Sequence, residues 1–230
     1  MGLAAAFSAQ LLLLLALPAS GGGPAAGPAR LVIDDFGEDA PGAFPAGWEL
    51  KADLLNPCRG KKKSFAVKAG PEGRYLAVES AGDACTAARR FPFDLSVYRV
   101  LSWRWRARVL PKGGDERTKA ADDSAAGLYV CFKGFALLPY CIKYVWSAAL
   151  PPGTVLASPF RKATKVVVLE SGSAKLGTWV EEKRDLYEDY LKVFGGRAVK
   201  NPAGVALLTD SDNTRSSAAA DYAGIAVSKD

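Results

Sequence analysis

Residues 101–110 read LSWRWRARVL, and this stretch carries the clearest strand pattern in the chain. Apolar side chains occupy every odd position from Leu101 to Val109, while Arg104, Arg106 and Arg108 occupy even positions. Successive side chains of a strand point to opposite faces, so one face here is apolar and the other is basic. The apolar face predicts a strand that packs on a core. The basic face predicts either a solvated surface or a groove that binds anions.

Short apolar runs separated by glycine, proline and aspartate continue along the chain. Many short strands with turn signals between them predict an all-β sandwich or barrel. The strands are expected at residues 30–36, 64–69, 74–80, 85–91, 100–110, 126–132, 141–147, 164–170, 178–186, 204–209 and 224–228.

One segment departs from the strand pattern and predicts a short helix near residues 185–194. Leu186, Tyr190 and Val193 fall on one face of such a helix. Asp185 is placed to cap its start, and Gly195 is placed to close its end.

The first 29 residues contain no Asp, Glu, Lys or Arg and include a run of five leucines. This pattern predicts a secretory signal peptide and a Gly/Pro/Ala linker, followed by one sandwich domain over residues 30–230. An uncleaved anchor is the alternative, although the apolar span is short for a transmembrane helix. We therefore expect a periplasmic or secreted protein with no transmembrane segment once the leader is removed.

Four cysteines in an exported chain predict two disulfides, for which three pairings exist. We favour Cys131–Cys141, whose cysteines bracket a turn-like segment, together with Cys58–Cys85. Buried thiols are the alternative, whereas the cysteine spacings do not fit zinc. The chain has no histidine at all, which excludes Ser-His-Asp and Cys-His catalysis. Carboxylates, lysine, tyrosine and arginine remain for any chemistry.

Polar side chains lie at the ends of two of the expected strands. Asp210, Asp212 and Asn213 come directly after one apolar run, and Asp122 and Asp123 directly precede another. Such residues commonly form turns. If the two loops converge at one end of the sandwich, their side chains also suit a ligand rim. The Asp-x-Asp-Asn pattern is only a partial calcium loop, because it lacks the glycine and the distal glutamate of an EF-hand.

The segment CIKYVWS at residues 141–147 places Lys143 on one face of a strand and Tyr144 and Trp146 on the other. An aromatic strand face predicts a core position, or a surface that stacks on a sugar ring.

The two ends of the expected domain suggest a separate cation site. If the terminal strands pair, Asp34 or Asp35 comes near Asp221, and the carboxylates and nearby carbonyls suit calcium. A structural calcium ion is the one cofactor that the sequence suggests.

Seven segments, taken in order, resemble the bacterial exported family called domain of unknown function 3047. The likeness runs from about residue 31 to residue 228 and implies a jelly-roll-like antiparallel β-sandwich, similar in layout to carbohydrate-binding modules. The family has no established activity, and the cysteines are not part of its pattern. The segments are LSWRWRARVLPKGGDER, DDSAAGLYVCF, IKYVWS, LPPGTV, VVVLESG, LGTWVEEKRDLYEDY and GVALLTDSDNTRSSAAADYAGIAVS. The polar positions that match are Arg104, Arg106, Asp122, Asp123, Lys143, Tyr144, Trp146, Asp210, Asp212, Asn213 and Asp221.

Three functions follow from these features. The first is a non-catalytic module that binds a glycan, including an anionic one, because the formal net charge is +6. The second is a carbohydrate-active enzyme. A glycosidase would pair Asp123 with Asp210 or Asp212, and a lyase would use Arg104, Lys143 and Tyr144. The third is contact with an anionic envelope component through GKKKS at residues 60–64 and the arginine face of residues 101–110. An exported chain does not predict nucleic-acid binding, and the oligomeric state is left open.

Overall fold

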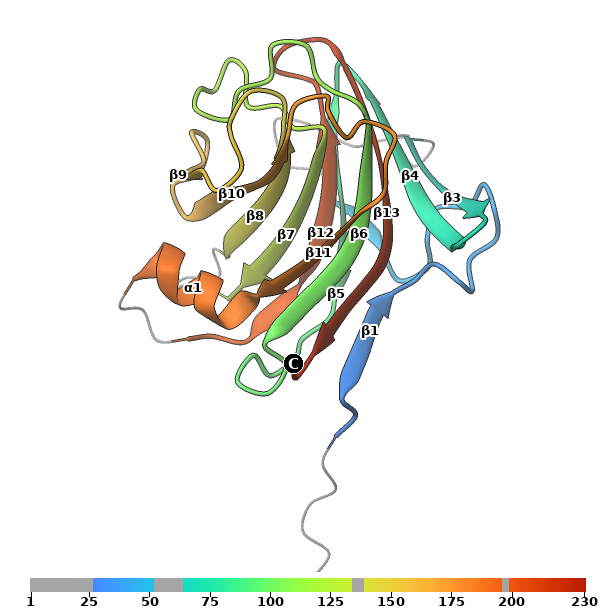
Figure 1. The fold of residues 1–230 in the computed structure, drawn as a ribbon, viewed down its shortest axis with the longest axis vertical. Helices are drawn as coiled ribbons and strands as arrows, with labels where there is room; N and C mark the ends of the chain where they lie inside the picture. Colours follow the sequence, from blue (N-terminus) through green and yellow to red (C-terminus); the bar gives the residue numbers. More distant parts are fainter. Residues whose placement is uncertain (1–26, 52–63, 134–138, 196–198) are drawn as a thin grey trace, which may run out of the picture.

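A computed structural model describes residues 27–51, 64–133, 139–195 and 199–230. These residues form two β-sheets packed face to face with one short helix at an edge, which confirms the predicted jelly-roll-like sandwich (Figure 1). The strands are β1 (Arg30–Asp34), β2 (Glu49–Lys51), β3 (Phe65–Gly70), β4 (Gly73–Ala81), β5 (Ala84–Arg90), β6 (Val100–Val109), β7 (Ala126–Phe132), β8 (Tyr140–Ser147), β9 (Val155–Ala157), β10 (Thr164–Ser171), β11 (Val180–Asp185), β12 (Pro202–Asp210) and β13 (Ser217–Ser228).

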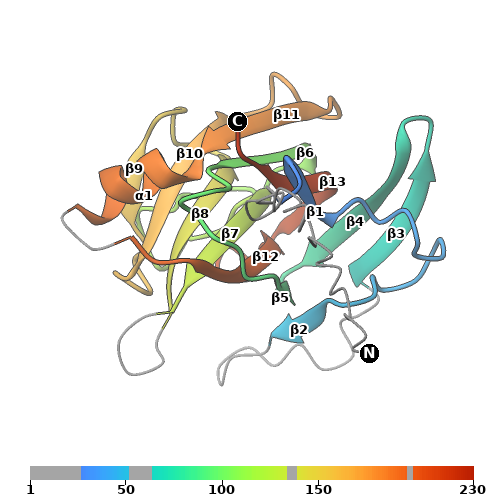
Figure 2. The same cartoon turned by 90° about the horizontal axis from the view of Figure 1, so that it is seen from below.

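The first sheet has the order β11-β6-β13-β4-β3, and β1 also pairs with β13. The second sheet has the order β2-β5-β12-β7-β8-β10-β9. The view from below shows the two layers side by side (Figure 2). The strand pairs of the described residues are antiparallel except β8 with β10, which run parallel. The sequence missed β2 and β9, because each is a three-residue strand at the end of its sheet.

The alternation in β6 decides which side of the first sheet faces the core. Leu101, Trp103, Trp105 and Ala107 are buried, while the arginines between them point to the outer face. Trp103 packs on Tyr144 of the opposite sheet with ring centroids 5.4 Å apart. Large aromatic rings from facing sheets therefore fill the space between them, as the hydrophobic effect favours.

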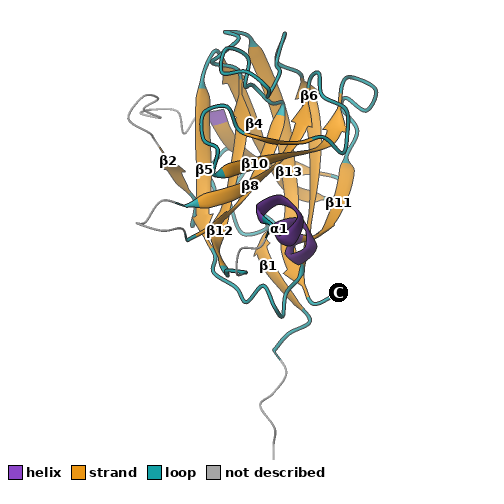
Figure 3. Ribbon diagram, turned by 90° about the vertical axis from the view of Figure 1, so that its left-hand side faces the viewer, coloured by secondary structure: helices purple, strands orange, loops and turns teal. Residues whose placement is uncertain are grey.

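The predicted helix is confirmed as α1 (Leu186–Phe194). The Asp185 side chain accepts a hydrogen bond from the Glu188 backbone N–H at 2.9 Å, which caps the first turn. Gly195 ends the helix with positive φ, and its N–H bonds to the Leu191 carbonyl. The helix lies at the open edge of the sandwich, between β11 of one sheet and the strands β8 and β10 of the other (Figure 3).

One of the two predicted disulfides lies within the described residues. The Cys131–Cys141 disulfide is confirmed, and it links residues directly opposite each other on β7 and β8. Cys58 lies outside the described residues, so its pairing with Cys85 stays a prediction.

The predicted leader and most of the lysine run at residues 60–64 also lie outside the described residues. Within the described part of the chain, no helix has the length and apolar character needed to cross a membrane.

Candidate functional site

The two acidic loops converge at the end of the sandwich drawn uppermost in Figure 1. The Asp123 carboxylate accepts hydrogen bonds from the backbone N–H groups of Asn213 at 3.2 Å and Thr214 at 2.7 Å. Asp210 accepts one from the Ser124 N–H at 2.7 Å. These contacts tie the loop before β7 to the loop after β12.

Lys143 lies at the centre of this region and is only 3% exposed. Its Nζ atom is 3.3 Å from Ser124 Oγ and 3.9 Å from the nearer oxygen of Asp210. The side chain passes over Gly127, where an added Cβ would come within 3.3 Å of Lys143 Cε. Glycine therefore leaves room for the lysine to reach the acidic loops.

We call the group formed by these side chains the Lys143 cluster. It consists of Glu116, Asp122, Asp123, Ser124, Lys143 and Asp210, all of them buried. Glu116 accepts hydrogen bonds from Ser124 Oγ and Ser147 Oγ. Most of the cluster's polar groups are thus used to hold its own loops together.

Burial controls the protonation of the Lys143 cluster. Desolvation raises the pKa of Asp210 to about 7 and of Asp122 to about 6, although Lys143 acts in the opposite direction on both. Burial alone would lower the pKa of Lys143, but Asp210 and the other surrounding groups raise it well above its usual value. The lysine therefore stays charged while part of the acidic charge is neutralised.

Three acids of this region come close together. One oxygen from each of Asp123, Asp210 and Asp212 lies within 4.8 Å of the other two. Asp123 and Asp210 already accept backbone hydrogen bonds, and Asp210 faces Lys143. These hydrogen bonds hold the two loops together.

The other predicted ligand residues lie elsewhere. Arg104 and Arg106 are on the outer face of the first sheet, where Arg104 pairs with Glu72 and the Arg106 guanidinium bonds Asp221 at 2.6 and 2.9 Å. Arg106 also lies over the Trp179 ring, 4.7 Å from its centroid. The basic face of β6 is therefore a network of paired charges.

Tyr144 and Trp146 point into the core and are fully buried, so neither presents a ring at the surface. The arginines of β6, the aromatic pair of β8 and the acidic loops therefore lie in separate places, and these predicted ligand residues do not form one site.

The terminal strands do pair, with Asp34 opposite Ile225. Asp35 is exposed and accepts a hydrogen bond from Gly37 N–H, while Asp221 is opposite Ala77 and Arg106 and bonds Arg106 and Arg108. A calcium role for Asp35 and Asp221 stays a prediction.

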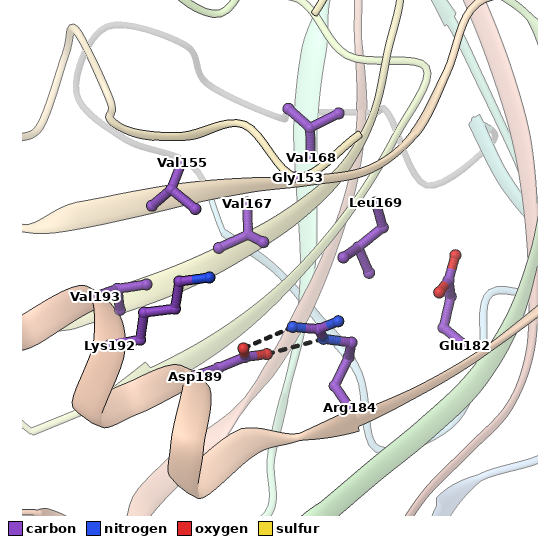
Figure 4. A pocket seen from close by; sticks show the side chains of 10 residues that line it. All are labelled: Gly153, Val155, Val167, Val168, Leu169, Glu182, Arg184, Asp189, Lys192 and Val193. Atoms are coloured by element: carbon purple, nitrogen blue, oxygen red, sulfur yellow. Dashed lines mark hydrogen bonds and ion pairs between the residues drawn. The ribbon is translucent and has the colours of Figure 1, made fainter. Parts of the chain in front are cut away.

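A pocket of about 280 Å³ lies at the open edge of the sandwich, and we call it the edge pocket. Charged side chains form one side of it and apolar side chains form the other (Figure 4). The charged residues come from β11 and α1, and most of the apolar ones come from β9 and β10. The lining residues are Gly153, Val155, Val167, Val168, Leu169, Glu182, Arg184, Asp189, Lys192 and Val193.

The charged side of the edge pocket is held in place by the core. Arg184 donates two hydrogen bonds to the Asp189 carboxylate, at 2.9 and 2.6 Å. The buried Tyr144 hydroxyl donates to the same carboxylate at 2.8 Å. Tyr144 therefore contributes to this pocket indirectly, by fixing the acid that orients Arg184.

Glu182 is the half-buried carboxyl group of the edge pocket. The indole Nε1 of Trp105 donates to its Oε1 at 3.1 Å. Desolvation, followed by the nearby charge of Glu170, raises the pKa of Glu182 to about 7. The group therefore populates both protonation states near neutral pH.

Sequence reasoning missed the edge pocket, although a signal was present. Val180, Glu182 and Arg184 alternate with exposed residues along β11, so two charged side chains share the inward face with a valine. Charged residues that point inward are one means of protecting an edge strand. Which strand lies at the edge is not visible in the sequence.

Fold and pocket together define a jelly-roll-like β-sandwich protein with a charged pocket at its open edge. The chain belongs to the family described as "Protein of unknown function (DUF3047)", whose model matches residues 48–226. No curated protein matches the chain.

Several solved structures are similar to the chain at low sequence identity. A xyloglucanase domain of a type three effector from Sinorhizobium fredii, in complex with cellobiose, is 12% identical; the match covers 83% of this chain and 98% of that one, with a TM-score of 0.41. A family 11 xylanase from Neocallimastix patriciarum is 13% identical, with coverages of 88% and 93% and a TM-score of 0.37. A cellulase derived from Rhodothermus marinus is 10% identical, with coverages of 80% and 96% and a TM-score of 0.39.

Proposed function

We propose that the protein is a non-catalytic carbohydrate-binding module whose ligand enters the edge pocket. The observation that supports this most directly is the division of the pocket into an apolar side and a charged side. A sugar ring has C–H faces that pack on apolar side chains and hydroxyl groups that need hydrogen-bonding partners. The volume of about 280 Å³ is slightly below the range of small-molecule pockets, which begins at roughly 300 Å³.

The prepared geometry of the charged side also favours binding. Arg184 is held by Asp189, which is itself held by Tyr144, so these groups lose little freedom when a ligand arrives. The Lys143 cluster is a weaker candidate because its side chains are buried and most of its polar groups are hydrogen-bonded to one another or to the adjoining loops.

A glycan array with the full chain at low salt tests the proposal, followed by titration calorimetry on each bound glycan. Leu169→Trp fills the edge pocket and should weaken binding at least tenfold. Val97→Trp makes a similar change at an exposed site outside the pocket and should leave affinity unchanged. Absence of binding across neutral and acidic glycans, or unchanged binding by Leu169→Trp, contradicts the proposal.

The second candidate function is a carbohydrate-active enzyme, and Glu182 is the observation that favours it. A half-buried carboxyl with a pKa of about 7 suits general acid or base chemistry. This residue replaces the Asp123 and Asp210 pair as the best-placed group, because those two carboxylates are buried and bonded to backbone N–H groups. Reducing-end and unsaturated-product assays on every bound glycan distinguish the enzyme from the binding module. Contact with an anionic envelope component stays a third prediction.

A further inference from the structure

We infer that the edge pocket selects a sugar that carries a carboxylate, of the uronic-acid type, with the ligand carboxylate placed between Lys192 and Arg184. This inference rests on the proposed carbohydrate function and names the ligand class for that same site. It follows from which charges in the pocket are already paired and which are not.

Lys192 supplies the unpaired positive charge. It lies in the last turn of α1 and lines the pocket, and no acidic side chain of the described residues forms an ion pair with it. Figure 4 shows its ammonium group directed into the same space as the Arg184 guanidinium. A second cation beside an already paired arginine is a surplus that an anionic ligand group would neutralise.

Arg184 is held in one orientation, but not all of its hydrogen-bond donors are used. Its Nε and Nη2 atoms donate to Asp189, which leaves Nη1 with no hydrogen-bond acceptor among the described residues. A guanidinium has five N–H donors in a fixed planar arrangement, so the unused nitrogen has a defined direction. The Tyr144–Asp189 bond maintains that direction from within the core.

Glu182 provides the group that binds a sugar hydroxyl at the other end of the pocket. Trp105 occupies its Oε1, so Oε2 is left for a sugar hydroxyl. Figure 4 places this carboxyl on the far side of Arg184 from Lys192, and Leu169 lies on the apolar side of the pocket. The ligand therefore has an acidic end toward α1 and a hydroxyl end toward β11.

The net charge of the pocket lining also fits a ligand with one acidic end. The Arg184–Asp189 pair cancels, so Lys192 and Glu182 determine the net charge of the pocket lining. The groups that face Glu182 are Glu170 on β10, Arg184 on β11, Lys175 in the preceding loop and the Trp105 indole on β6. Whenever Glu182 is protonated, the pocket carries one positive charge and matches one ligand carboxylate.

Titration calorimetry with matched sugars tests the inference. The probes are oligosaccharides of glucuronic or galacturonic acid and their carboxyl-reduced neutral counterparts, which differ only in the carboxylate. The full chain at pH 6 should bind the acidic member of a pair at least tenfold more tightly, as expected for a charge-assisted contact. Lys192→Gln should remove most of that difference, because it should weaken binding of the acidic sugar much more than binding of the neutral one.

Lys183→Gln provides the matched control, because Lys183 is an exposed residue of β11 outside the pocket. It removes the same charge from the chain and should leave the preference intact. Equal affinity for acidic and neutral sugars, or equal effects of the two variants, overturns the inference while the carbohydrate function stands. Failure of every sugar to bind overturns both.

Discussion

The Lys143 cluster and the edge pocket are built from the same kinds of side chain but differ in what those side chains contact. Lys143 is buried and faces Ser124 and Asp210, which in turn bond the neighbouring loops. Lys192 is exposed at a pocket and has no described acidic partner. Charged groups that satisfy one another stabilise a fold, whereas oriented groups with unused donors are available to a ligand.

The largest effect is expected from Lys143→Met, which removes the cation that faces Asp210. The carboxylates of the cluster would remain buried without it, and loss of one partner of a buried ion pair typically costs about 3–5 kcal/mol. The free energy of unfolding, measured by urea denaturation at pH 7, should fall by that amount. Lys68→Met, at an exposed position of β3, should change it by less than about 0.5 kcal/mol.

Sugar binding by folded Lys143→Met protein should match that of the wild type, because the cluster and the edge pocket share no residue. A loss of stability below about 1 kcal/mol would remove the distinction between a structural cluster and a binding pocket.

A change of pH is expected to have an intermediate effect on stability. Asp122 and Asp210 have folded pKa values of about 6 and 7, above the unfolded value of about 3.9, so the folded state binds more protons. Their stabilising contribution is complete below pH 4 and is lost as the pH rises through 6 to 7. Glu116, Asp123, Lys143 and Ser158 are the other groups that face them.

The melting temperature should therefore fall by roughly 5–10 °C between pH 5.5 and pH 8, as judged by calorimetry. Asp210→Asn should flatten this dependence. A melting temperature that rises over the same interval would contradict the protonation assigned to the cluster.

The smallest effect on stability is expected from Glu182→Gln in the edge pocket. The amide oxygen can still accept the Trp105 hydrogen bond, and the side chain is half-buried, so stability should change by less than about 1 kcal/mol. Its effect should appear in binding instead. The wild type should bind an acidic sugar less tightly at pH 8 than at pH 6, because the Glu182 carboxyl, with a pKa near 7, becomes charged.

Glu182→Gln should bind the acidic sugar with similar affinity at both pH values, as measured by calorimetry. Glu181→Gln is the matched control, since Glu181 is the exposed neighbour on the same strand. A pH dependence that persists in Glu182→Gln would assign the titration to another group.

Local patterns in the sequence were sufficient for much of the fold. The alternation around Trp103 and Trp105 identified both faces of β6, and Asp185 with Gly195 marked the ends of α1. The spacing of Cys131 and Cys141 identified a disulfide across neighbouring strands. Each of these features depends on residues that are close in the chain, where the geometry of a strand, a helix cap or a turn follows from the residue types.

The sequence by itself determined an all-β chain without histidine chemistry and with acidic loops at the strand ends. Only the tertiary structure decided which charges are paired, because Arg106 is 115 residues from its partner Asp221. It also placed β11 at one edge, β10 parallel to β8, and α1 beside both, which created the edge pocket. Strand order and register depend on how distant segments bury their apolar faces together, and no local pattern specifies that choice.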